Sequence, residues 1–334
     1  MTGIDIGLYD FDPHATVFFF IVSPDEEIYL RYGGRDAVAA DSYLDLASLE
    51  LALELGLEQH ARWRAGELPE RPRPAPFFSR DIAALKKTEM SGRRSCVECH
   101  HIGDYQAAEM EAAGKLDKPR IMFRSPDIRA IGIHLDVPQG LTVARASGAA
   151  AEAGLSSGDK IIALNDSAVL TFGDFLYAYD ALDRASTGLR LRVDRGGAHV
   201  DLQVSLPPLW WAYDIGFRRW SIDPMTFFDS EPLSTERKSE LGLPADGLAC
   251  EVTSVSRRAR AQELHTLEPG DVIHSVAGAQ GGPRRENCEL FIKLNVRSGS
   301  AVDLGVIRGG QQIEMRMSTH RQYYRMTPPA RSRP

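Results

Sequence analysis

The sequence predicts an α+β protein of several domains, and three observations lead to that class. The chain has 334 residues, which at roughly 150 residues per domain is enough for two or three. Stretches in which apolar and polar residues alternate, as in strands, occur beside stretches with apolar residues at helical spacing. From about residue 128 onward, one pattern occurs twice. We therefore expect a repeated domain preceded by a different N-terminal part.

Composition and charge exclude several classes of protein. Apolar residues make up 43% and charged residues 25%, which is typical of soluble globular proteins. The net charge of −7 does not favour nucleic acid or an anionic membrane surface as a partner. No stretch approaches the roughly 20 apolar residues of a membrane span. Residues 1–5 have neither a basic start nor an apolar core, so no signal peptide is visible.

The N-terminal part is predicted to form two strands followed by a helix. Residues 16–22 are an apolar run of strand length, 23–26 a turn and 27–32 a second strand. A helix is expected over about 45–64, capped by Ser42 or Asp45, because leucines recur at three- and four-residue spacing. The leucines expected to mark one apolar face are Leu46, Leu49, Leu53 and Leu57.

This order of strand, strand and helix resembles the second half of a thioredoxin-like domain. The half that carries the redox cysteine pair of a thioredoxin is absent, and a β-β-α piece cannot by itself bury both faces of its sheet. The resemblance therefore implies that the chain continues upstream. The alternative is a small α/β appendage that is unrelated to thioredoxins.

One motif in the chain requires chemistry rather than packing, namely Ser95-Cys96-Val97-Glu98-Cys99-His100-His101. Cys-x-x-Cys-His is the attachment signature of c-type haem, in which two thiols bind the porphyrin covalently and the imidazole binds the iron. Cys96 and Cys99 would anchor the haem and His100 would be the proximal ligand, with Met110 or Met122 on the opposite face. Haem is attached outside the cytoplasm in bacteria. This interpretation therefore predicts a periplasmic or other extracytoplasmic protein, an electron-transfer partner and a start further upstream.

Two other interpretations of the motif stay open. In the first, Cys96 and Cys99 form a catalytic redox dithiol, with Arg93, Arg94 and a helix N-terminus stabilising the thiolate. In the second, both cysteines and two histidines hold a structural zinc ion, although no second ligand pair occurs at zinc-site spacing. Whether the protein is an enzyme stays undecided, because the motifs of serine hydrolases, zinc proteases and P-loop nucleotide-binding proteins do not occur.

The other two cysteines are isolated in the sequence. Cys250 lies in an alternating, strand-like run and is expected to be a small buried apolar residue. Cys288 lies far from it in the chain. Four cysteines in a chain of this length do not predict a disulfide scaffold.

The repeated pattern consists of a Gly-Asp turn followed, at nearly constant distance, by an Arg-Gly-Gly turn. In the first copy Gly158 precedes Arg195 by 37 positions, and in the second Gly270 precedes Arg308 by 38 positions. A buried strand and a helical stretch are expected between the two turns, and an alternating strand after them. The two copies therefore share one frame.

The first copy, with Ala153-Gly154-Leu155 leading into Gly158-Asp159, resembles the PDZ domains of bacterial proteases, and the second resembles them more loosely. The resemblance implies two β-sandwich or barrel domains that bind the C-termini of peptides or proteins as an added strand. Backbone N–H groups of one loop would capture the ligand carboxylate. By motif position this loop would be Ile131, Gly132, Ile133 and His134 in the first copy, and Leu241, Gly242, Leu243 and Pro244 in the second. Because Pro244 donates no N–H, capture by the second copy is doubtful.

The whole arrangement resembles a bacterial family of thioredoxin-like/PDZ proteins, some of which are selenoproteins. This resemblance implies redox chemistry combined with partner binding, and the rival interpretation is a non-enzymatic PDZ adaptor. Three of the four tryptophans fall between the two copies, where we expect them to pack rather than bind a ligand. The expected segments are an N-terminal piece (1–66), a Pro/Arg linker (67–79), the Cys-x-x-Cys-His segment (80–126), a PDZ domain (127–207), an aromatic connector (208–236), a second PDZ domain (237–319) and a disordered tail (320–334).

Overall fold

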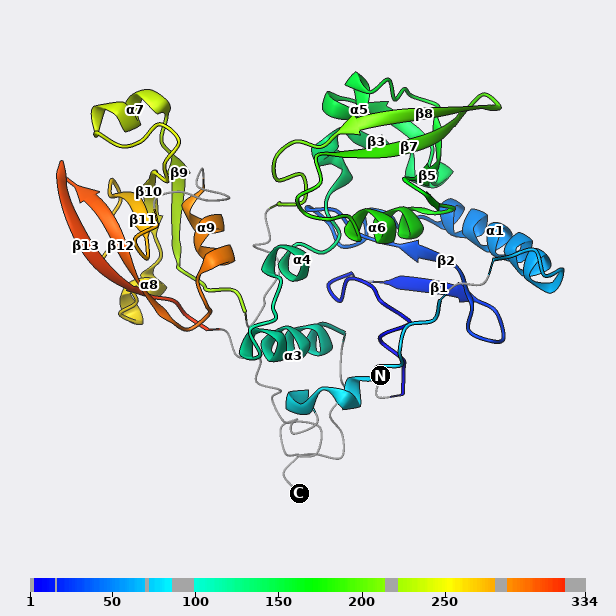
Figure 1. Ribbon diagram of the computed structural model, residues 1–334, viewed down its shortest axis with the longest axis horizontal. Helices are drawn as coiled ribbons and strands as arrows, with labels where there is room; N and C mark the ends of the chain where they lie inside the picture. Colours follow the sequence, from blue (N-terminus) through cyan, green and yellow to red (C-terminus); the bar gives the residue numbers. More distant parts are fainter. Residues whose placement is uncertain are drawn as a thin grey trace. The chain divides into compact units, whose positions relative to one another are not determined.

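The computed structural model describes residues 3–15, 17–69, 72–85, 99–213, 222–279 and 287–321. This part of the chain is α+β with several small antiparallel sheets, and is compatible with PDZ-like domains. The chain divides into two compact units (Figure 1). Unit 1 comprises residues 1–106 and 116–218, and unit 2 comprises residues 107–115 and 219–334. None of the described helices combines the length and apolar character needed to cross a membrane.

The N-terminal hairpin and helix are confirmed. Strands β1 (Phe18–Val22) and β2 (Ile28–Gly33) pair antiparallel. Between them, the hydroxyl of Ser23 accepts the N–H groups of Asp25 and Glu27, which stabilises the turn. Helix α1 (Leu46–Arg64) begins after Asp45, whose carboxylate accepts two N–H groups of the first turn. The relationship to thioredoxins stays a prediction.

The face that α1 buries is not the predicted leucine face. Leu53 and Leu57 are 51% and 71% exposed, whereas Ala52 and Gly56 are buried. A Cβ at Gly56 would lie 2.8 Å from a methyl carbon of Ile21 in β1. The helix therefore approaches the strand too closely for a large side chain, and small residues occupy the contact.

Repeat 1, residues 127–206, contains a two-stranded sheet β3-β4 and a four-stranded sheet in the order β6-β5-β7-β8. Its strands are β3 (Ile133–Leu135), β4 (Val143–Ala146), β5 (Lys160–Leu164), β6 (Ser167–Ala168), β7 (Gly188–Arg195) and β8 (Ala198–Ser205). Its helices are η2 (Ile128–Ile131), η3 (Val137–Gln139), α5 (Gly148–Glu152) and α6 (Phe172–Asp180). Helix α6 lies on the chain between β6 and β7, as the helical stretch of the repeated pattern predicts.

Repeat 2, residues 222–320, contains one five-stranded antiparallel sheet in the order β13-β12-β11-β10-β9. Its strands are β9 (Phe228–Pro232), β10 (Cys250–Val255), β11 (Val272–Val276), β12 (Ala301–Arg308) and β13 (Gln311–Ser318). Its helices are α7 (Thr235–Glu240), α8 (Arg257–Ala261) and α9 (Cys288–Asn295). This repeat begins earlier than the predicted residue 237, because β9 belongs to its sheet. It also extends into the predicted tail, because His320 pairs with Met225.

Outside the hairpin and the two repeats, the described residues also form η1 (Ser79–Asp81), α3 (Cys99–Ala112) and α4 (Lys118–Met122). Helix α3 begins before the predicted residue 105 and includes Cys99 and His100. Trp210 and Trp211 are 2% and 3% exposed, so these two tryptophans pack inside unit 1 as expected. The indole N–H of Trp211 donates to the carbonyl of Arg184 at 3.0 Å.

The same ion pair joins the Gly-Asp and Arg-Gly-Gly turns in both repeats. Nε of Arg195 donates to Oδ1 of Asp159 at 2.7 Å, and Nε of Arg308 donates to Oδ1 of Asp271 at 2.7 Å. The other oxygen of each aspartate accepts the N–H three residues earlier. Hydrogen bonds from Arg195 lower the pKa of Asp159. Burial has the largest effect on Asp271 and raises its pKa, but the hydrogen bonds from Arg308 and from the N–H of Glu268, together with the charge of Arg308, outweigh burial, so that pKa is also lowered. The repeat seen in the sequence is therefore a structural repeat.

Cys250 of β10 and Cys288 of α9 form a disulfide, which the sequence analysis did not predict. Their Cα atoms lie 6.0 Å apart and both residues are fully buried. The predicted burial of Cys250 is confirmed, but its prediction as an unpaired apolar residue is wrong. The two cysteines are separated by 38 positions, and only the packing of α9 against the sheet brings them together.

Candidate functional site

The loop predicted to bind a peptide in repeat 1 leads into β3. Gly132 has a φ of +87°, and a Cβ there would lie 1.7 Å from the carbonyl oxygen of Ser147, so the position requires glycine. The carbonyl of Gly132 accepts the N–H of Ser147, the residue that precedes α5. Ile131 and Ile133 are buried. The two isoleucine side chains therefore belong to the core.

His134, the last residue of the predicted loop, interacts within repeat 1. It lies on β3 opposite Arg145 of β4, and its Nε2 is 2.9 Å from a guanidinium nitrogen of Arg145. Burial, together with the charge of Arg145, lowers the pKa of His134. Because arginine can only donate, Nε2 of a neutral imidazole accepts this hydrogen bond.

In repeat 2 the predicted loop, Leu241–Leu243, lies between the end of α7 and β10. The position equivalent to Gly132 is Phe227, whose carbonyl accepts the N–H of Ser256, the N-cap residue of α8. Phe227 has a φ of +59°, so the left-handed conformation of Gly132 is kept without a glycine. Sequence comparison missed this position because no glycine marks it. Carboxylate capture stays a prediction for both repeats.

Strand β9 presents an outer edge to α9. Among the described strands, β9 pairs only with β10. The N–H of Ser230 points away from β10 and donates to Oε1 of Glu289, in the first turn of α9, at 3.0 Å. Since backbone groups alternate along a strand, those of Phe228 point the same way. Strand β9 therefore has two outward N–H groups, those of Phe228 and Ser230, because Pro232 has none.

Glu289 lies in a region where a carboxylate is poorly solvated. It is half-buried, and burial raises its pKa against the lowering effect of the Ser230 N–H and of Lys293. Asp229 on β9 raises this pKa further. One turn along the helix, Nζ of Lys293 lies 3.4 Å from Oδ2 of Asp223. The charge of Lys293 is therefore shared between two carboxylates.

In repeat 1 the equivalent helix, α6, contacts the edge of a strand from outside the repeat. The N–H of Arg31 in β2 donates to Oδ1 of Asp174 at 3.0 Å, and the hydroxyl of Thr171 donates to the carbonyl of Arg31. A Cβ at Gly173 would lie 2.6 Å from that carbonyl oxygen. Figure 1 shows α6 between β2 and the strands of repeat 1. The N-terminal hairpin therefore covers α6 at its first turn.

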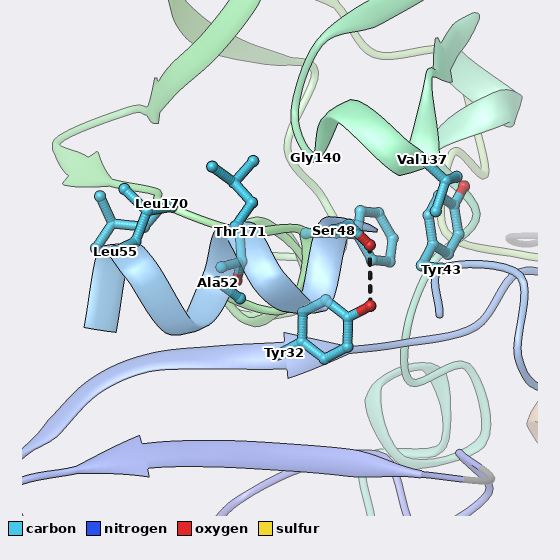
Figure 2. Close-up of a pocket in the computed structure, with 11 residues that line it drawn as sticks. Tyr32, Tyr43, Ser48, Ala52, Leu55, Val137, Gly140, Leu170 and Thr171 are labelled. Carbon is cyan, nitrogen blue, oxygen red and sulfur yellow. Dashed lines mark hydrogen bonds between the residues drawn. The ribbon is translucent and has the colours of Figure 1, made fainter. Parts of the chain in front are cut away.

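At the start of α6, Tyr43 stacks on Phe172 with ring centroids 3.5 Å apart. Beside them is a cavity of about 20 Å³ lined by residues of α1, β2 and repeat 1 (Figure 2). The hydroxyl groups of Tyr32 and Ser48 lie 2.9 Å apart in its wall. A cavity of this size holds roughly one water molecule. It is therefore a packing defect and not a ligand site.

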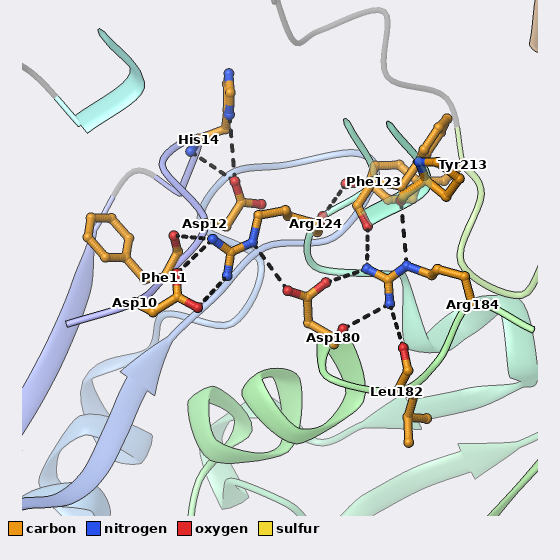
Figure 3. A network of polar contacts seen from close by, with 11 residues as sticks. Asp10, Phe11, Asp12, His14, Phe123, Arg124, Asp180, Leu182, Arg184 and Tyr213 are labelled. Carbon is orange, nitrogen blue, oxygen red and sulfur yellow. Dashed lines mark hydrogen bonds and ion pairs between the residues drawn. The ribbon is translucent and has the colours of Figure 1, made fainter. Parts of the chain in front are cut away.

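At the end of α6, Asp180 joins two arginines (Figure 3). Its carboxylate lies 3.2 Å from Nε of Arg124 and 2.6 Å from Nη2 of Arg184. Arg124 also binds Asp10 of the N-terminal segment at 2.8 Å, and its carbonyl accepts the hydroxyl of Tyr213. The N-terminal part is thus attached to both ends of α6.

Cys99 lies in the wall of a cavity of about 920 Å³ in unit 1. The other lining residues are mostly apolar, and the aromatic ones include Tyr9, Phe11, Phe18 and Phe20. The ring centroids of Phe18 and Phe20 are 5.3 Å apart. Cys96 lies outside the described residues. The described half of the Cys-x-x-Cys pair therefore borders a large aromatic cavity.

Two of the other predicted ligands, His100 and Met110, are not placed to bind one iron from opposite sides. His100 packs against His101, with ring centroids 4.2 Å apart. Met110 follows His100 by ten residues on α3, which is about 15 Å along a helix axis and too far for opposite ligands of one iron. Within the described ranges, no group of three or more Cys, His, Asp or Glu side chains could hold a metal ion. The zinc and haem interpretations stay predictions.

No protein-family model and no curated protein matches the chain. Solved structures of HtrA-type proteases show partial similarity. A variant of the protease AlgW with a decapeptide is 19% identical, with a TM-score of 0.27 over 44% of each chain. AlgW with a tripeptide is 23% identical, with a TM-score of 0.25 over 32% of this chain and 33% of the protease. The chain therefore spans less than half the length of these proteases.

Proposed function

We propose that the protein binds the C-terminal segment of a partner protein through repeat 2, as a PDZ-type domain. The observation that carries this proposal is the outer edge of β9, where the N–H of Ser230 points toward α9 instead of into the sheet. A peptide added as a strand uses such outward groups, and a helix beside the edge completes a groove. The turn at Phe227 leads into β9 and is proposed to receive the ligand carboxylate.

Repeat 1 is proposed to have a structural role. Its helix α6 contacts β2 through Asp174 and Thr171. At Gly173 the helix lies so close to β2 that no ligand strand fits between them. Helix α9 borders the proposed groove in repeat 2, whereas its equivalent in repeat 1, α6, is covered by strand β2. We expect one bound peptide per chain.

The test is peptide binding by fluorescence anisotropy, with the hexapeptide Gly-Ser-Ala-Lys-Ala-Val, labelled at its N-terminus and ending in a carboxylate. In Ser230→Pro the outward N–H is lost while the sheet is kept, because proline is tolerated in an edge strand where its missing N–H faces outward. Affinity should fall about tenfold, because the ligand carbonyl opposite position 230 is left without a donor, at a cost of about 1.4 kcal/mol. Ser230→Ala keeps the N–H and should bind within about twofold of the parent.

Equal binding by Ser230→Pro and the parent protein would place the peptide elsewhere. Two peptides per chain would contradict the structural role of repeat 1. An amidated version of the peptide, which lacks the terminal charge, should bind more weakly if a carboxylate is captured.

A second proposed function is redox chemistry at Cys96 and Cys99. It is favoured by the cavity beside Cys99, whose volume of about 920 Å³ is in the range of ligand sites and whose wall is mostly apolar. With haem, both cysteines would anchor the porphyrin and His100 would be its proximal ligand, and the bound group would supply one-electron chemistry to an extracytoplasmic partner. Without haem, the two thiols would exchange with a disulfide of a substrate.

An absorption spectrum separates these alternatives. The protein is made with an export signal in a host that matures c-type cytochromes. A Soret band that survives acid–acetone extraction supports covalent haem, and its absence together with two reversibly oxidised thiols supports the dithiol. If Cys96→Ser with Cys99→Ser changes neither spectrum nor thiol chemistry, the redox proposal fails and the adaptor interpretation stands.

A further inference from the structure

We infer that Glu289 closes the outer edge of β9 in the unbound protein and, once displaced, selects peptides with a cationic side chain at the third residue from the C-terminus. This inference rests on the proposed function of repeat 2. It names the residue that controls access to the groove and the chemistry of the partner that replaces it.

Glu289 occupies the place of a ligand backbone. Its Oε1 accepts the N–H of Ser230 at 3.0 Å, and the hydroxyl of Ser230 lies 3.5 Å from the same oxygen. An added strand would offer a carbonyl oxygen to this N–H. The carboxylate and the peptide carbonyl therefore compete for one donor, and binding requires that Glu289 move away.

The register of the strand decides which ligand residue meets Glu289. Phe228 and Ser230 are the outward positions of β9 that carry an N–H, and Phe228 directly follows the turn at Phe227. A C-terminal residue held at that turn lies opposite Phe228, so the residue two positions earlier lies opposite Ser230. Paired residues project their side chains to the same face of a sheet. The hydroxyl of Ser230 points toward Glu289, so the side chain of that ligand residue does too.

The charges around Glu289 favour a cation at this place. The charge of Asp229 on β9 acts on Glu289, and Lys293, the nearby base on α9, is already paired with Asp223. A displaced Glu289 remains half-buried and loses the hydrogen bond from Ser230. A ligand lysine or arginine supplies a new donor together with a compensating charge, whereas a ligand carboxylate adds repulsion.

Repeat 1 provides an internal comparison. Gly173 and Glu289 are both the second residue of their helix. Where the position is glycine, the backbone of β2 lies against the helix, and a Cβ would be 2.6 Å from the carbonyl oxygen of Arg31. Where the position is glutamate, the carboxylate of Glu289 accepts the N–H of Ser230, which a ligand strand would otherwise use. The side chain at this position therefore determines whether a strand can approach the helix.

The experiment compares three hexapeptides, Gly-Ser-Ala-Xaa-Ala-Val, in which Xaa is Lys, Ala or Glu. With the parent protein, the Lys peptide should bind about tenfold more tightly than the Ala peptide, and the Glu peptide about tenfold more weakly, as expected for one partly desolvated charge pair. In Glu289→Gln the three affinities should agree within about threefold, because the charge is gone but the shape is kept. Glu314→Gln, an exposed glutamate of β13, is the matched control and should keep the preference.

In Glu289→Ala nothing competes for the Ser230 N–H, so the Ala peptide should bind about fivefold more tightly than to the parent. A preference for lysine that persists in Glu289→Gln overturns the inference, while the proposed function survives. Equal binding of all three peptides by the parent would likewise overturn the inference and leave the proposed function standing. If none of the peptides binds the parent, the proposed function fails and the inference with it.

Discussion

The equivalent helices of the two repeats, α6 and α9, contact different kinds of strand. In repeat 1, Asp174 of α6 accepts the N–H of Arg31, which lies 143 positions earlier in the chain. In repeat 2, Glu289 of α9 accepts the N–H of Ser230, on a strand of its own sheet. In both, a carboxylate in the first helical turn satisfies a backbone donor at a strand edge that none of the described strands pairs with. The comparison shows that a carboxylate at the start of this helix can bind a strand from outside the repeat, as Asp174 does, or the edge strand of its own sheet, as Glu289 does.

The first residue of each helix also differs. Phe172 begins α6 and stacks on Tyr43 of the N-terminal part, whereas Cys288 begins α9 and is bonded to Cys250 of β10. Helix α6 is therefore held by contacts from outside the repeat, and α9 by a covalent bond within it. Three predictions test this contrast, beginning with the covalent bond.

Removing the disulfide should have the largest effect. Cys250→Ala with Cys288→Ala opens a loop of 38 residues, for which chain entropy predicts a loss of about 4 kcal/mol in the free energy of unfolding. Urea unfolding measures this loss by comparing the protein that keeps the disulfide with the double alanine variant, both in a Cys96→Ser, Cys99→Ser background. Reductant should destabilise the protein that keeps Cys250 and Cys288 and leave the double alanine variant unchanged. An unchanged urea midpoint after complete reduction would show that the bond does not hold α9.

Gly173→Ala should detach the hairpin from α6. The new Cβ would lie 2.6 Å from the carbonyl oxygen of Arg31, which belongs to backbone and cannot rotate away. We expect a loss of about 3 kcal/mol, at the upper end of overpacking effects. Hydrogen exchange of the Arg31 amide should become much faster. Gly188→Ala is the control, since its Cβ would make an ordinary contact of 3.4 Å. Equal protection of Arg31 in both variants would contradict the contact.

The docking of the hairpin should also depend on pH. Burial raises the pKa of Asp174 to about 6, against the lowering effects of Arg31 and its N–H. In the unfolded chain the pKa is about 3.9. Because the folded pKa is the higher one, the stabilising contribution is complete below pH of about 4 and is lost as pH rises through about 6. Between pH 4.5 and 7 the loss is about 2 kcal/mol.

Asp174→Asn should remove this part of the pH dependence. Urea unfolding of the parent and the variant across that pH range gives the difference directly, because all other groups are common to both. Parallel curves for the two proteins would mean that Asp174 titrates alike in the folded and unfolded states.

Local signals in the sequence predicted the elements around the site well. The N-terminal hairpin follows from an apolar run of strand length and a turn signal, and the two repeats follow from their Gly-Asp and Arg-Gly-Gly turns. Signals that depend on partners far along the chain failed. The leucines of α1 suggested a buried face, but the close approach at Gly56 buried the small residues instead. The turn at Phe227 escaped notice because tertiary contacts, and not a glycine, hold its left-handed conformation.

The sequence by itself determined where the turns, strands and helices of each repeat lie, because these depend on neighbouring residues and on spacing along the chain. The nearly equal distances from Gly158 to Arg195 and from Gly270 to Arg308, 37 and 38 positions, reflect one ion pair between an exposed arginine and a buried aspartate that both repeats make. Only the tertiary structure decided which strand edge each helix faces. That choice depends on contacts between residues up to 143 positions apart, and on whether the second residue of the helix leaves space for a backbone or fills it with a carboxylate.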